Sequence, residues 1–148
     1  MKRERRRARS LALQVLYEVD SVNHPPLEII AQRLKHNQNL DDEVADFAMR
    51  LVMGTLEYAT ELDQLIGSCA PEWPVEELAI LDRNILRLAL WEFAVSTETP
   101  LKVAINEAVE LAKRFGSDSS PRFINGVLGT LAKHEQKIRR QLQPTSHK

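Results

Sequence analysis

Apolar residues recur along most of the chain at intervals of three and four, the spacing of one face of an α-helix. Near the amino terminus these positions are Ala8, Ala12, Val15, Leu16 and Val19. They predict a first helix over about residues 3–20, ending before the Asn-His-Pro-Pro segment at 23–26. The chain has five glycines and few β-branched runs, whereas an all-β sandwich or barrel needs a turn about every ten residues. We therefore expect an all-α fold.

The same periodicity predicts further helices at about 27–36, 42–67, 78–95, 100–115 and 120–132. Asp41 or Asp42 is a candidate cap for the helix at 42–67, and Thr99 with Pro100 forms a cap and first-turn pair for the helix at 100–115. Gly116 is expected to end that helix in a left-handed conformation. Beyond residue 132 the sequence is polar, with Ile138 and Leu142 as its apolar anchors.

The segment at 78–95 is expected to form a central helix. Thirteen of its 18 residues are apolar, and we expect a helix that is apolar on most sides to be buried by neighbours from both halves of the chain. The Pro-Glu-Trp-Pro stretch marks a boundary between two halves near residues 70–74. We expect one helical domain over residues 1–142 and a disordered tail over 143–148.

Charge is distributed unevenly, although the net charge is only −1. Residues 2–9 carry six positive side chains and one negative side chain, or +5, and the remainder of the chain carries −6. Because neutralising phosphates releases counterions, a basic end on an acidic chain is typical of a polyanion-binding protein. A solvated, frayed terminus would have the same composition. The apolar face that follows favours arginines fixed on a docked helix.

A second candidate surface combines basic and aromatic residues. Lys113, Arg122 and Phe123 lie on either side of the turn at Phe115-Gly116. Cations suit phosphates and a flat ring suits an unstacked base, so this group is a candidate surface for single-stranded nucleic acid. Phe123 is also explained by a place in the core.

Catalytic and metal sites find little support in the sequence. The four histidines fall in predicted loops or the tail, and Cys69 is the only cysteine, which excludes an intrachain disulfide. No apolar stretch approaches the roughly 20 residues that span a bilayer. We expect a cytoplasmic protein without a catalytic site, metal or cofactor, acting as a monomer or homodimer away from membranes.

Several longer motifs together resemble the NusB family of transcription antitermination factors. They are Arg-Arg-Arg-Ala-Arg at 5–9 with Ala-Leu-Gln-Val-Leu-Tyr at 12–17, Asp-Arg-Asn-Ile-Leu-Arg-Leu-Ala-Leu-Trp-Glu at 82–92, the segment Pro100–Gly116, and Phe-Ile-Asn-Gly-Val-Leu at 123–128. The resemblance extends over about residues 3–132.

This resemblance implies two packed three-helix bundles, about seven helices in all, and binding to the boxA element of nascent RNA together with the ribosomal protein NusE. It also implies that the complex joins the RNA polymerase elongation complex with other Nus factors and suppresses termination. The expected RNA contacts are Arg5, Arg6, Arg7, Arg9, Lys113, Arg122 and Phe123. The expected NusE contacts are Tyr17, Asp82 and Arg83.

Two other functions are compatible with a helical fold. The same fold occurs as the RNA-binding N-terminal domain of ribosomal RNA cytosine methyltransferases, so a related RNA-binding adaptor without catalysis is one alternative. Methyl transfer itself would require a further domain with a glycine-rich cofactor loop. An adaptor that binds only protein is the other alternative, and it leaves the arginine cluster unexplained.

Overall fold

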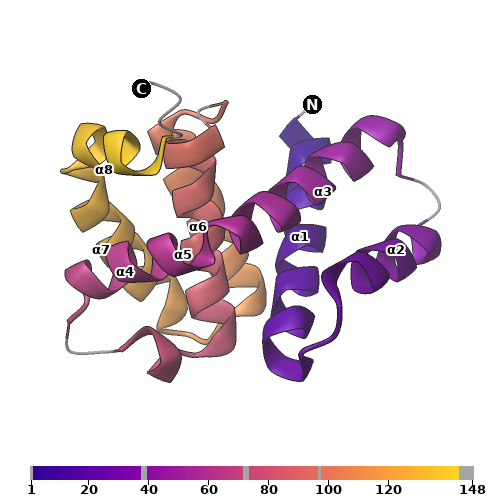
Figure 1. Cartoon of the computed structure of the whole chain (residues 1–148), viewed down its shortest axis with the longest axis horizontal. Helices are drawn as coiled ribbons and strands as arrows, with labels where there is room; N and C mark the ends of the chain where they lie inside the picture. The colour runs from indigo at the N-terminus through magenta and orange to yellow at the C-terminus, as the bar shows by residue number, and fades with distance from the viewer. Residues whose placement is uncertain (1, 38–39, 72–73, 97, 144–148) are drawn as a thin grey trace. The chain divides into compact units, whose positions relative to one another are not determined.

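The computed structural model describes residues 2–37, 40–71, 74–96 and 98–143, and these residues form helices and connecting turns without any strand (Figure 1). The all-α fold expected from the sequence is therefore confirmed, with eight α-helices in the described part of the chain, close to the expected seven. Two compact units divide the chain, Met1–Glu57 and Tyr58–Lys148.

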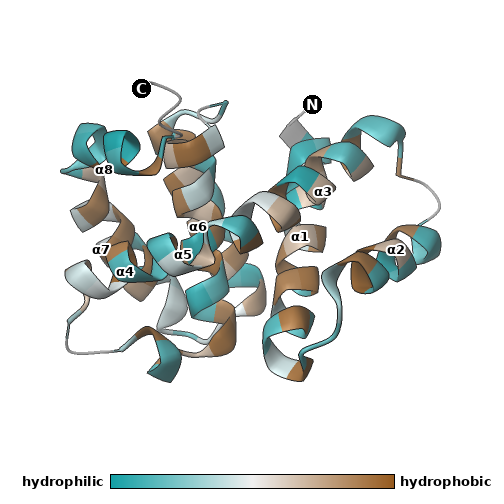
Figure 2. Ribbon diagram, in the orientation of Figure 1, coloured by the Kyte–Doolittle hydropathy of each residue, from teal (hydrophilic) through white to brown (hydrophobic). Residues whose placement is uncertain are grey.

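The first unit is a three-helix bundle of α1 (Lys2–Val22), α2 (Pro26–His36) and α3 (Asp42–Glu57), in which α1 packs against both other helices. Its core includes the buried side chains Leu13, Leu16, Ile30 and Leu51. Figure 2 colours the ribbon by hydropathy and shows brown hydrophobic stretches on all three helices. Helix α1 ends at Val22 and is followed by Asn23, whose φ of 59° is left-handed, a conformation that asparagine adopts more readily than most residues. Asp41 Oδ1 accepts a hydrogen bond of 2.9 Å from the Val44 N–H, which confirms the predicted cap of α3.

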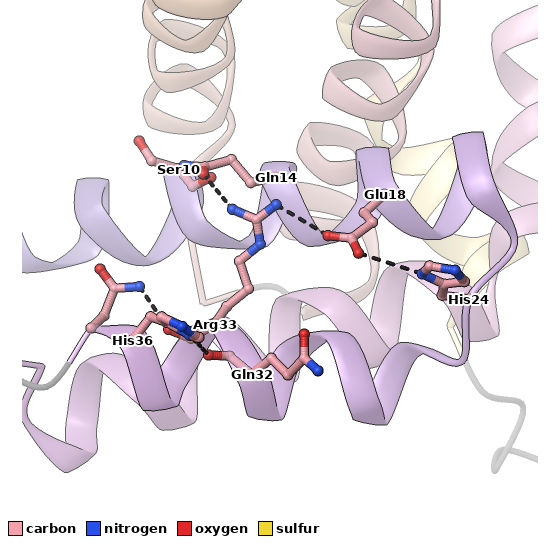
Figure 3. Close-up of polar contacts among 8 residues, drawn as sticks. Ser10, Gln14, Glu18, His24, Gln32, Arg33 and His36 are labelled. Atoms are coloured by element: carbon pink, nitrogen blue, oxygen red, sulfur yellow. Dashed lines mark hydrogen bonds and ion pairs between the residues drawn. The ribbon is translucent and has the colours of Figure 1, made fainter.

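A polar clamp joins α2 to α1 in this unit (Figure 3). The Arg33 guanidinium donates to Gln14 Oε1 at 2.8 Å and to Glu18 Oε1 at 3.1 Å. The second carboxylate oxygen of Glu18 lies 3.5 Å from His24 Nδ1 in the turn between the helices. The two contacts of Arg33 fix α2 against α1. The contact of His24 fixes the turn between these helices against α1.

The second unit comprises α4 (Ala59–Cys69), the 3₁₀ turn η1 (Val75–Glu77), α5 (Ile80–Trp91), the π-helical segment η2 (Glu92–Ser96), α6 (Leu101–Phe115), α7 (Ser120–Ala132) and α8 (Glu135–Leu142). Within this unit α5 contacts α4, α6 and α7. Its side chains Ile85, Leu86, Leu88 and Leu90 are at most 1% exposed. Arg87 also binds Asp63 of α4 through two hydrogen bonds, at 2.7 and 2.8 Å. Helix α5 is thus the central helix of the second unit.

The single helix expected over 42–67 is wrong. Helix α3 ends at Glu57 and α4 begins at Ala59, because Tyr58 adopts φ −103° and ψ 13°, outside the helical range. Gly54, Thr55 and Tyr58 all favour helix less than alanine or leucine does, so this stretch is a weak point in the helix. The two units divide at the same place, whereas the Pro-Glu-Trp-Pro stretch predicted a boundary near 70–74; residues 72–73 of that segment lie outside the described residues.

The start of α6 also differs from expectation. Pro100 is its cap residue and makes no side-chain capping hydrogen bond. Thr99 instead donates its hydroxyl to Glu92 Oε2 at 2.7 Å, and both side chains are buried. A buried carboxylate requires hydrogen-bond donors, and meeting that requirement takes the Thr99 hydroxyl away from the helix end.

The turn between α6 and α7 depends on close approach rather than on a left-handed residue. Gly116 has φ −91°, so the predicted left-handed stop is wrong. A Cβ at this position would lie 2.6 Å from the Cβ and Oγ of Ser120. Ser120 Oγ accepts from the Ser117 N–H at 3.0 Å and donates to Asp82 Oδ1 of α5 at 2.7 Å. Glycine is needed here because the buried Ser120 side chain occupies the adjacent space.

The polar end of the sequence forms an additional helix. Ile138 and Leu142 of α8 are 3% and 4% exposed, so both predicted anchors are buried. Helix α8 packs against η2, and Gln143 Nε2 donates to the Ala94 carbonyl at 2.6 Å. Residues 144–148, for which we expected disorder, lie outside the described residues.

A helix that spans a membrane must be long and apolar. Among the described residues, no helix has both the length and the apolar character required.

Replacing Leu88 tests the central position of α5. Its side chain is 1% exposed, so Leu88→Ala should lower the free energy of unfolding by about 2–5 kcal/mol, measured by urea denaturation. Val103→Ala on α6 is the control, because Val103 is 41% exposed and should change stability by at most about 0.5 kcal/mol. A Leu88→Ala effect as small as that of the control would contradict this role for α5.

Two glycine substitutions test the close approach at the α6–α7 turn. Gly116→Ala should destabilise the protein by about 1–3 kcal/mol, because the new methyl group would overlap Ser120. Gly129→Ala in α7 should stabilise it by about 0.5–1 kcal/mol, because its new Cβ would meet nothing within 4 Å. Equal effects in urea denaturation would show that helix propensity alone governs both positions.

Candidate nucleic-acid interface

The arginine-rich motif lies on the first turns of α1, as expected, and its members differ in exposure. Arg5, Arg6 and Arg7 are exposed, whereas Arg9 is only 4% exposed. Arg9 lies among the buried residues Ala8, Ser10 and Leu11, where the packed part of α1 begins, whereas residues 3–7 precede this part and are exposed. The exposed part of the motif is thus a run of three consecutive guanidinium groups on an anchored helix.

An aromatic ring from α3 lies beneath this part of α1. The Arg5 Cζ atom lies 4.1 Å from the centre of the Phe47 ring, and the Arg9 Cζ atom lies 5.5 Å from it. A third guanidinium, from Arg50 one turn further along α3, lies at 5.4 Å. The negative face of an aromatic ring attracts guanidinium groups at such distances, so Phe47 restrains the orientation of the arginines around it.

The second basic group surrounds the α6–α7 turn. Lys113 at the end of α6 is exposed and lies 3.5 Å from Glu110, and Arg122 in the first turn of α7 is exposed. Phe123 is half-buried, so its ring is neither wholly core nor wholly free. Arg122 and Phe123 line an open groove whose other side includes residues 69–71 at the end of α4. The groove presents a cation and part of an aromatic ring next to each other.

The α6–α7 turn is held to α5 through Ser120 and Asp82, as described above. Since Arg122 follows Ser120 by two residues, this hydrogen bond also fixes the first turn of α7. Asp82, expected on the partner face, therefore has a structural contact within the second unit.

The three residues expected to contact NusE lie on two different elements. Tyr17 on α1 is 43% exposed, which is unusual for a large aromatic side chain. Asp82 and Arg83 lie in the first turn of α5 and are half-buried. Arg83 Nη1 donates to the Glu76 carbonyl at 3.1 Å, so its guanidinium stabilises η1 as well.

Within the described residues, no group of three or more His, Cys, Asp or Glu side chains is arranged to hold a metal ion.

Sequence reasoning missed two features of these sites, the arginine-stacked face of Phe47 and the tie from Ser120 to Asp82. Phe47 read as one position of an apolar stripe, and only its three-residue spacing from Arg50 hinted at a cation beside it. The Ser120 contact spans 38 residues of sequence, so no local pattern could reveal it.

This chain is similar in sequence to proteins of a known family. A family model described as the NusB family matches residues 6–133. The transcription antitermination protein NusB of Roseiflexus castenholzii is 50% identical over 129 residues, covering 86% of this chain and 90% of the relative.

Solved structures agree with the sequence matches. NusB of T. maritima aligns with a TM-score of 0.82 at 32% identity, covering 93% of this chain and 97% of that one. A crystal structure of the antitermination factors NusB and NusE in complex with dsRNA aligns with a TM-score of 0.82 at 26% identity, covering 90% and 98% of the two chains. The resemblance inferred from the motifs is therefore confirmed, and the chain with this arginine-rich α1 and this α6–α7 turn belongs to the NusB family.

Proposed function

We propose that this NusB-family protein is a transcription antitermination factor that binds the boxA element of nascent, chiefly ribosomal, RNA together with NusE. The observation that carries the proposal is the exposure of Arg5, Arg6 and Arg7 on a helix whose opposite face is buried. Such an arrangement presents fixed positive charge to a phosphate backbone. The solved NusB–NusE complex with dsRNA supports the proposal, because that relative aligns over nine-tenths of this chain.

Base recognition is assigned to the second basic group. Phosphate contacts position a nucleic acid but carry no sequence information. The half-buried Phe123 ring beside the exposed Arg122 suits an unpaired base with its phosphate. Lys113 adds a further cation at the end of α6. Discrimination for boxA would then depend on this group and on contacts that NusE contributes.

Partner binding is assigned to Tyr17, Asp82 and Arg83. Tyr17 supports this assignment because exposed tyrosines are enriched at protein interfaces. If NusE and RNA bind the same complex cooperatively, each must strengthen the other by the same factor. The RNA-bound pair would then join RNA polymerase and the other Nus factors and suppress termination. In this role the protein is a cytoplasmic binding factor and catalyses no reaction.

Removing exposed arginines tests the RNA assignment. Arg6→Ala with Arg7→Ala should weaken binding to a single-stranded boxA RNA and flatten the plot of log K against log salt by about 0.7 for each phosphate that is no longer neutralised. Arg9 is left unchanged because its buried side chain also contributes to packing. Scrambled and double-stranded RNA of the same length serve as controls for sequence and strand preference. An unchanged salt slope would exclude these arginines as phosphate contacts.

Asp82 provides a test of the partner face that separates its charge from its hydrogen bond. Asp82→Asn keeps an oxygen that accepts from Ser120 and removes the negative charge. It should weaken NusE binding, measured by calorimetry, and leave the RNA affinity of the isolated protein unchanged. Ser120→Ala is the matched control, because it breaks the same hydrogen bond and keeps the charge. Unchanged NusE affinity for Asp82→Asn, or equal weakening in both variants, would contradict a direct charge contact.

A further inference from the structure

A hollow beside Phe47 on the first unit contains charged residues that have not been assigned a role in RNA binding. It is lined by Glu4, Arg5, Glu43, Val44, Phe47 and Arg50. Phe47 is 4% exposed, and the guanidinium carbon atoms of Arg5, Arg9 and Arg50 lie 4.1, 5.5 and 5.4 Å from the centre of its ring. Of these three, Arg5 and Arg50 are exposed to solvent. Two exposed cations from different helices are therefore held close to one ring.

An arginine that is stacked on an aromatic ring can still bind a phosphate. An arginine contacts an aromatic ring through the flat face of its guanidinium group, whereas phosphate oxygens are recognised by the N–H groups at its edge. An unrestrained arginine side chain loses rotamer entropy when it is fixed. The Phe47 ring reduces that cost, since it restrains Arg5 and Arg50 before any ligand binds.

We propose that Arg50 on α3 is a further contact for an RNA phosphate, and that Phe47 is a positioning residue that holds Arg5 and Arg50 beside each other. This inference rests on the proposed function and extends the RNA surface from α1 onto α3. The position of Arg50 supports it, because Arg50 shares the ring with Arg5, a member of the arginine-rich motif.

Two carboxylates in the same hollow should have the opposite effect on RNA binding to that of the arginines. Glu4 and Glu43 line it together with Arg5 and Arg50, and both are exposed. Each would repel a phosphate bound between the arginines. Neutralising Glu43 should therefore strengthen RNA binding, an effect that a purely structural role of this region would not produce.

The experiment measures binding of the full-length protein to a single-stranded boxA RNA over a range of salt concentrations. Arg50→Gln should weaken binding about two- to fivefold and lower the salt slope by about 0.7. Phe47→Leu keeps an apolar side chain and removes the ring face, and it should weaken binding to a similar extent. Glu43→Gln should strengthen binding about two- to fivefold. Lys35→Gln on α2 is the matched control, because it removes one exposed charge from the same unit and should alter binding by less than twofold.

The outcomes separate this inference from the function on which it rests. In one outcome the unaltered protein binds boxA RNA, Arg6→Ala with Arg7→Ala weakens binding, and Arg50→Gln has no more effect than Lys35→Gln. This outcome overturns the inference and leaves the proposed function standing. Weaker NusE binding by Arg50→Gln with unchanged RNA affinity would also overturn it, by assigning the surface to protein. If the unaltered protein fails to bind RNA, both fail. Should Phe47→Leu unfold, Arg50→Gln and Glu43→Gln still decide the question.

Discussion

Burial of the apolar face of α1 is the constraint on which the arginine-rich surface depends. The amphipathic sequence of this helix packs its apolar side chains against α2 and α3, and Ala8, Ala12 and Val15 are completely buried. A free peptide of the same composition would bind polyanions without preferred geometry. Anchoring the helix fixes Arg5, Arg6 and Arg7 relative to each other and to the Phe47 ring. Hydrophobic packing thereby converts a charge cluster into a surface with a defined shape.

In the second unit, partly buried polar contacts fix the helices against one another. Helix α5 supplies an apolar centre, and it also carries Asp82 and Arg87, which bind Ser120 of α7 and Asp63 of α4. An unpaired polar group in a partly buried position destabilises the folded protein. Each of these pairs therefore favours one register between its two helices, whereas apolar contacts alone are less specific. The Ser120 contact also fixes the turn that carries Arg122 and Phe123.

Two positions in this unit depart from regular helical geometry for identifiable reasons. The π-helical segment η2 continues α5 and contains the buried Glu92, whose carboxylate receives the Thr99 hydroxyl. Gly116 lacks a side chain where the Ser120 side chain must fit. In both places a buried polar side chain, Glu92 or Ser120, lies at the irregular stretch of backbone.

The all-α class, most helix boundaries, the strongly apolar character of α5 and the position of the arginine-rich motif on α1 could be predicted from the sequence. These features follow from the 3.6-residue period and from charge, which are local properties of the chain. Packing explains what the sequence did not show: Arg9 is buried while Arg5 is exposed, three guanidinium groups surround the Phe47 ring, and Thr99 and Gly116 are fitted to Glu92 and Ser120. Each of these features depends on which side chain from outside the same helix occupies the adjacent space, and the spacing of residues within one helix contains no information about that neighbour.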